Sequence, residues 1–187
     1  MWAKYTGVQL LVASAIILCT TAAYTTAAQA QSVPEKTGVN SALGIAPKTQ
    51  DFVTLAAQSD MLEIESGKLA LTKSDNSKTK QFAERMIKDH TQTSTELKGL
   101  VAGGKVPASL PPTLDKAHQD KLDKLTKSSG REFTREYDAL QVSAHKDAVS
   151  MFERYSKEGD NPELKAFAAK HLPHLQDHLK MAQDLDK

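Results

Sequence analysis

The sequence predicts an all-α fold, an antiparallel four-helix bundle with a crossover connection that carries a short extra helix. Three observations support this. Apolar residues recur at three- and four-residue steps over four stretches of about 25 residues, which is typical of amphipathic helices. Residues 31–187 contain no strand-like alternation of useful length. The connections between the four stretches are short, long and short, so the middle one must cross over the bundle.

Residues 1–30 have the features of a secretory signal peptide. Lys4 supplies the charged start, Val8–Cys19 is a mostly apolar run, and Ala28-Gln29-Ala30 is a small-residue cleavage site. The run is shorter than the roughly 20 residues that a membrane span needs. We therefore expect cleavage after Ala30, no stable membrane insertion afterwards, and a location in the periplasm or cell envelope. Lipidation of Cys19 is disfavoured because Leu18, which is not small, precedes it.

The composition of the mature chain limits what it can bind. Cleavage would remove the only cysteine and the only tryptophan, so the exported chain could form no disulfide. Lys4 is the one charged side chain of the leader, and without it the formal net charge falls from +1 to zero. Such a balance gives no attraction to nucleic acid. Residues 31–48, rich in Ser, Pro, Gly and Asn, are predicted to form a flexible linker before a helical domain over residues 49–187.

Turn and cap residues set the bounds of the predicted helices. Ser74-Asp75-Asn76-Ser77, Gly103-Gly104 and Gly159-Asp160-Asn161-Pro162 each stop one helix or start the next. The four long helices are expected over Thr49–Lys73, Ser77–Ala102, Arg131–Lys157 and Pro162–Asp184, and the short one over Thr113–Lys127. Two antiparallel pairs joined by a crossover define the ferritin-like topology.

Several polar residues fall on the apolar faces of these helices. On a helical wheel Glu63 lies near the centre of its apolar stripe, and a carboxylate facing a core needs a partner. The number of residues that separates each of these polar positions from the nearest tight turn gives its height along the bundle. By this measure the inward-facing polar residues of all four long helices lie within one or two helical turns of the same height. The sequence thus predicts a single metal site in the bundle core. Its candidate ligands are Glu63, His90, His145 and His178, with His174 as an additional candidate.

Two alternatives bear on this site. Buried histidines can be satisfied structurally, and Glu63 with His90 could form a hydrogen-bonded pair; His118 and His171 are expected to be structural or exposed. A di-iron centre needs Glu-x-x-His motifs. The residues three positions before the candidate histidines of the second, fourth and fifth predicted helices are Ile87, Val142 and Leu175. Ferroxidase chemistry is therefore disfavoured, and one zinc, copper, iron or manganese ion fits better.

Most of the mature chain resembles a known bacterial family, domain of unknown function 4142, whose members are usually exported and are predicted to be ferritin-like. The segments that carry the resemblance are Glu63–Ala70 (EIESGKLA), Phe82–His90 (FAERMIKDH), Tyr137–His145 and Leu172–Leu179. The resemblance implies that Glu63, His90, His145 and His178 are the polar core positions. It implies no activity, because the family has none established.

Three functions are consistent with these observations. The first is a non-enzymatic envelope protein that binds one metal ion for metal handling or stress tolerance. The second is a redox enzyme using that ion, which would require an open coordination position and a substrate pocket. The third is a metal-free structural or interaction protein. No catalytic residue and no protein partner is indicated by the sequence.

Overall fold

The structure, a computed structural model, describes residues 32 and 39–185. In this part of the chain all regular secondary structure is helical, with no strand. The helices are α2 (Val39–Ala42), α3 (Thr49–Lys73), α4 (Ser77–Ala102), α5 (Lys116–Lys127), α6 (Gly130–Glu158) and α7 (Pro162–Leu185). The all-α prediction is confirmed, and the bounds of α3 and α4 agree with those predicted.

The helix starts follow from side-chain caps. The Asn76 side chain accepts hydrogen bonds from the backbone N–H groups of Lys78 and Thr79, which fixes the start of α4. Asp115 likewise accepts from the backbone N–H of His118, so α5 begins at Lys116, three residues later than the predicted Thr113. The cap of α5 was the local signal that the sequence prediction overlooked.

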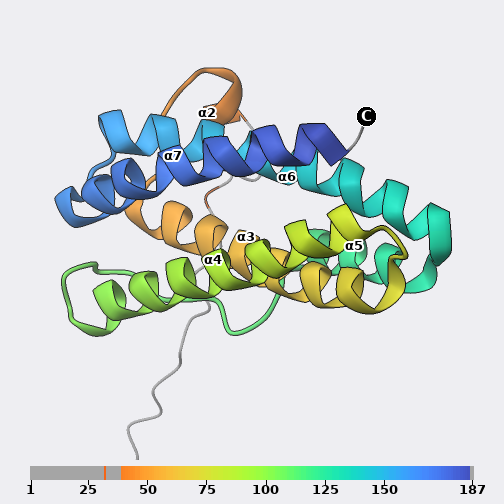
Figure 1. Cartoon of the computed structure of the whole chain (residues 1–187). Helices are drawn as coiled ribbons and strands as arrows, with labels where there is room; N and C mark the ends of the chain where they lie inside the picture. Colours follow the sequence, from red (N-terminus) through yellow and green to blue (C-terminus); the bar gives the residue numbers. More distant parts are fainter. Residues whose placement is uncertain (1–31, 33–38, 186–187) are drawn as a thin grey trace, which may run out of the picture.

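The four long helices pack in two pairs, α3 with α4 and α6 with α7, and the pairs contact each other through α3 with α6 and α4 with α7 (Figure 1). The connection from α4 to α5 starts at one end of the bundle and runs back along α3, where Gln50 and Gln58 donate hydrogen bonds to the carbonyl groups of Ser109 and Thr113 (Figure 1). Helix α5 then packs against α3. This arrangement brings faces of α3, α4, α6 and α7 to one core.

The core consists of two apolar clusters with a layer of buried polar residues between them. Each long helix passes from one cluster, through the polar layer, into the other. On α6, for example, Phe133 and Tyr137 belong to one cluster and Met151 and Phe152 to the other. The polar layer contains Asp60 and Glu63 from α3, His90 from α4, Gln141 and His145 from α6, and His178 from α7.

The predicted linker is only partly described by the structure. Its described residues are Ser32 and residues 39–48, which include the short helix α2. The hydroxyl of Ser32 donates to Oδ2 of the buried Asp51 over 2.6 Å, and Arg154 Nη1 donates to the carbonyl of Ile45, so both parts contact the bundle. The predicted leader, residues 1–30, lies outside the described residues. Within the described part of the chain, the helices are too polar or too short to cross a bilayer.

Candidate metal centre

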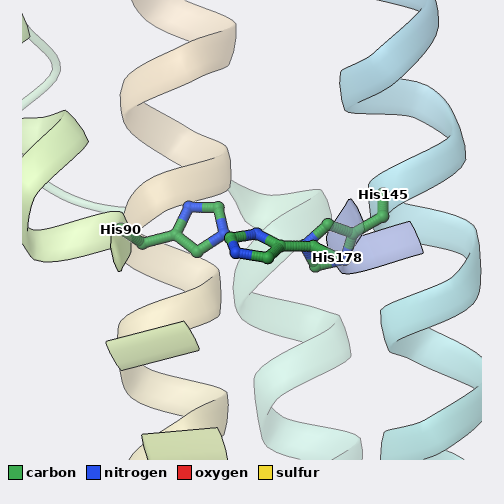
Figure 2. A group of neighbouring side chains, drawn as sticks. All are labelled: His90, His145 and His178. Atoms are coloured by element: carbon green, nitrogen blue, oxygen red, sulfur yellow. The ribbon is translucent and has the colours of Figure 1, made fainter. Parts of the chain in front are cut away.

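Three histidines from three different helices meet in the polar layer. His90 comes from α4, His145 from α6 and His178 from α7, and their exposed fractions are 3%, 1% and 2%. The ring centroids are 5.7, 5.6 and 5.5 Å apart, so the rings form a nearly equilateral triangle. Figure 2 shows the rings pointing toward one another. One nitrogen from each residue lies within 4.8 Å of the other two, and we call this group the histidine triad.

Each ring of the triad has a hydrogen-bond partner on one of its nitrogens. His90 Nδ1 lies 2.8 Å from Asp60 Oδ1, and His178 Nε2 lies 2.9 Å from Asp89 Oδ2. His145 Nδ1 lies 2.9 Å from the backbone carbonyl of Gln141, and a carbonyl can only accept, so this nitrogen carries the proton. Partners of this kind fix the ring orientation and the tautomer of metal-binding histidines.

The remaining nitrogen of each ring has no hydrogen-bond partner among the described residues. These atoms are Nε2 of His90, Nε2 of His145 and Nδ1 of His178, and all three are buried. Leaving a buried polar atom unpaired costs about 1–3 kcal/mol. Buried rings that point toward one another and each keep an unpaired nitrogen are what a metal site requires. Nitrogens bound to one ion at about 2.0–2.1 Å lie roughly 3.4 Å apart in tetrahedral geometry, so small ring rotations would close the site.

The environment keeps two of the imidazoles, those of His90 and His178, in the form that binds metals. Burial, with the neighbouring His145, lowers the pKa of His90 to about 4, although Glu63 opposes this. Burial and the nearby His90 likewise lower the pKa of His178 to about 4, against the effect of its hydrogen bond to Asp89. Both rings are therefore neutral at neutral pH. A neutral imidazole with one nitrogen occupied by a donor hydrogen bond presents a lone pair on the other.

Glu63, the predicted carboxylate ligand, is buried in the same layer but is not a member of the triad. Its Oε1 lies 4.0 Å from Nδ1 of His145, which is the nitrogen turned toward the Gln141 carbonyl. Its Oε2 has no hydrogen-bond partner within the described chain. The structure thus places a second buried carboxylate beside the triad, and its role as a ligand stays a prediction.

Asp60 is the residue that sequence reasoning missed. It is 3% exposed, and burial raises the pKa of its carboxyl well above the usual range. The proposed structural pair of Glu63 with His90 is absent, because the partner of His90 is Asp60. The signal was available: Asp60 precedes Glu63 by three residues, so the two share one face of α3.

Asp89 is the outer partner of His178 and lies partly open to solvent. Its carboxylate also accepts a hydrogen bond from Arg85 Nε over 3.2 Å. Partial burial alone would raise the pKa of Asp89, but the hydrogen bonds from His178 and Arg85 hold it below the usual value. Asp89 therefore carries a negative charge beside the triad at neutral pH.

A cavity of about 120 Å³ adjoins the triad. His90 and His178 form part of its wall, and so does His174, which is exposed and lies outside the triad. His171 is buried and its Nε2 lies 3.0 Å from Glu96 Oε2, which agrees with the structural role expected for it. His118, away from this cavity, pairs with Asp115 over 2.8 Å.

Comparison with known proteins identifies the family. Two solved structures of the protein CopM are similar to this chain. The Cu(II)-bound form has a TM-score of 0.62 and 18% identity over 76% of this chain and 97% of that one. The Cu(I)-bound form has a TM-score of 0.59 and 19% identity over 73% and 94%. At such identities the likeness concerns the fold alone. No curated protein matches the sequence. Residues 34–185 match the family described as Domain of unknown function (DUF4142), and the chain therefore belongs to that family.

Proposed function

We propose that this protein binds one transition-metal ion at His90, His145 and His178 and serves metal handling or stress tolerance without catalysing a reaction. The observation that carries the proposal has two parts: the three buried rings bring one nitrogen each within 4.8 Å of one another, and each ring has one nitrogen without a hydrogen-bond partner in the described chain. A purely structural polar layer would use hydrogen bonds to satisfy such atoms. The outer partners of the three rings instead hold them in the orientation that suits a metal.

Copper is the first candidate ion. Neutral imidazoles suit copper, zinc and iron, whereas manganese prefers oxygen ligands. For a given nitrogen site, divalent copper binds most tightly of the first-row ions. The similar fold of CopM, which is known in Cu(I)- and Cu(II)-bound forms, supports the same choice. Zinc is the second candidate, since three histidines are a frequent zinc ligand set.

Glu63 completes the site in this proposal. A divalent ion among three neutral rings places two positive charges in a buried core, which is unfavourable unless they are balanced. The Glu63 carboxylate, 4.0 Å from His145 Nδ1, supplies one negative charge within the same layer. It would act either as the fourth ligand after a side-chain rotation or as the counter-charge.

The ferritin-like description and the export of the protein also belong to this proposal. The connections in the order short, long, short support the ferritin-like topology. The leader pattern in residues 1–30 supports delivery to the periplasm or cell envelope. The intact mass of the exported protein tests the second point, because cleavage after Ala30 leaves a chain that begins at Gln31.

Isothermal titration of the apoprotein with copper, zinc, iron and manganese tests metal binding. We expect one ion per chain for wild type and for the control His118→Ala, and strongly weakened binding for His145→Ala. His145 is the best position to change, because the hydrogen-bond acceptor of its ring is a backbone carbonyl and not a carboxylate side chain. Equal binding by wild type and His145→Ala would leave the metal-free structural protein as the better description.

A further inference from the structure

The buried position of the histidine triad raises the question of how an ion reaches it. The three rings are at most 3% exposed, so no ion can bind from bulk solvent directly. The 120 Å³ cavity connects two environments: His90 and His178 lie in its inner wall, and the exposed His174 lies in its outer wall. One water molecule needs about 10–15 Å³ and polar partners, so the cavity is large enough to hold water beside its polar residues, although most of its wall is apolar.

Helix α7 presents three histidines to this cavity in succession. His171, His174 and His178 are three and four residues apart, and all three line the wall. His174 and His178 are about 6 Å apart along the helix axis. His171 is held by Glu96, which also accepts from Lys170 Nζ over 2.7 Å. Among the described residues, His174 makes one interaction: its ring centroid lies 6.5 Å from that of His171. Its ring nitrogens are therefore available to bind a metal ion.

The charges around the cavity favour a cation. Asp89, in the wall, carries a negative charge and is hydrogen bonded to His178. The one lysine in the wall, Lys170, is neutralised by Glu96. The hydroxyl groups of Ser59 and Thr93 add neutral oxygen atoms. A metal cation in this cavity would therefore find the His174 ring at the outer end and the Asp89 carboxylate in the wall. At the inner end it would find the rings of His90 and His178.

We propose that this cavity is the path by which the ion reaches and leaves the triad, and that His174 is the first ligand on that path. The proposal rests on the proposed function. His174 binds the incoming ion at the surface and transfers it over one helical turn to His178. It is not a ligand of the ion at rest. A residue that acts only on the path changes the rates of uptake and release by the same factor and leaves the dissociation constant unchanged.

The first test measures both rates and the equilibrium for His174→Ala in the full mature chain, with copper and with zinc. Uptake is followed by stopped flow from a coloured metal–chelator complex, and release by transfer to excess chelator. We expect both rates to fall several-fold while the dissociation constant stays within about twofold of wild type. The control is His118→Ala, which removes a histidine that does not line this cavity. It should leave both rates unchanged.

The second test narrows the cavity without touching a histidine. Thr93 and Thr91 both lie on α4, and each hydroxyl donates to the backbone carbonyl four residues earlier. Thr93 lines the cavity, whereas Thr91 is exposed elsewhere on the helix. Thr93→Phe should slow uptake and release, and Thr91→Phe should not.

The outcomes separate this inference from the proposed function. Wild-type uptake rates in both His174→Ala and Thr93→Phe would overturn the path. A loss of equilibrium affinity in His174→Ala as large as in His178→Ala would also overturn it, by making His174 a resident ligand. If the wild-type chain binds no ion at equilibrium, the proposed function itself fails.

Discussion

Nδ1 of His90 and Oδ1 of Asp60 lie 2.8 Å apart with both side chains buried, so one turn of α3 determines how a histidine of α4 is oriented. The contact joins two helices that pack directly against each other. It holds the His90 ring where it lies 5.7 Å from the His145 ring and 5.6 Å from the His178 ring. Asp60 thus acts on the proposed metal through His90 rather than by contact.

Asp60→Asn should weaken metal binding without removing a ligand. The amide keeps a hydrogen-bonding group beside Nδ1, but it cannot become the carboxylate that a metal-bound ring, protonated on Nδ1, would favour. Changes to outer partners of ligating histidines typically reduce metal affinity by about 10–100-fold. Competition titration measures the affinity, with Asp75→Asn in the exposed α3–α4 turn as the control. An unchanged affinity would mean that Asp60 serves packing alone.

Metal should raise the thermal stability of the protein. An ion that binds the native state alone stabilises it by about 2.7 kcal/mol when free metal exceeds its dissociation constant a hundredfold. We expect a corresponding rise in melting temperature that a chelator reverses. His90→Ala and His178→Ala should abolish the rise, and His118→Ala should retain it. Scanning calorimetry with and without metal makes the measurement; the same rise in all variants would point to ions bound elsewhere.

The metal-free protein should lose stability as the solution becomes acidic. Folding lowers the pKa of His90 and of His178 to about 4, whereas an unfolded histidine titrates near 6.5. Between these values the unfolded chain binds more protons, so the free energy of unfolding falls as the pH drops from 6.5 to 4. Each histidine contributes on the order of 3 kcal/mol. Asp60 acts in the opposite sense, because folding raises its pKa.

Urea denaturation of the apoprotein at pH 7, 5.5 and 4.5 measures this dependence. His90→Asn should show a smaller loss than wild type, since it has one buried imidazole fewer. His118→Asn should follow wild type. A free energy of unfolding that is independent of pH over this range contradicts the assignment of neutral buried rings.

Gly67 should resist substitution because α3 and α4 approach closely there. A Cβ atom added at this position would lie 2.8 Å from Cγ1 of Ile87 and 3.3 Å from the carbonyl oxygen of Ala83. Alanine in a helix interior normally gains about 0.5–1 kcal/mol over glycine. Overpacking costs about 1–3 kcal/mol, so Gly67→Ala should be destabilising by about 1 kcal/mol in net.

Combining Gly67→Ala with Ile87→Ala tests the cause. The second change removes the atom in conflict, so the double variant should be more stable than the sum of the single effects predicts. Denaturant unfolding measures the three variants. If the two effects are additive, the contact with Ile87 is not the reason why Gly67→Ala is destabilising.

The helices could be predicted from the sequence, and the details of the site only in part. The periodicity and turn residues located α3 and α4 at their observed bounds, because helix faces and caps are local properties of the chain. Counting from the turns brought His90, His145 and His178 to one level. It could not tell which ring nitrogen faces inward, since that depends on contacts between helices. Asp60 was not predicted because it lies beside the centre of the apolar stripe of α3, whereas Glu63 lies near that centre.

The polar layer between the two apolar clusters affects how cooperatively the bundle unfolds. Each cluster is continuous within itself, but the histidine layer separates them and, without metal, leaves several of its buried polar atoms without a hydrogen-bond partner. The metal-free protein should therefore open in parts, with amide hydrogen exchange differing between the two ends of the helices. An ion bound to α4, α6 and α7 at once would connect the halves and make exchange more uniform. Metal would then act as a link that converts two weakly coupled folding units into one.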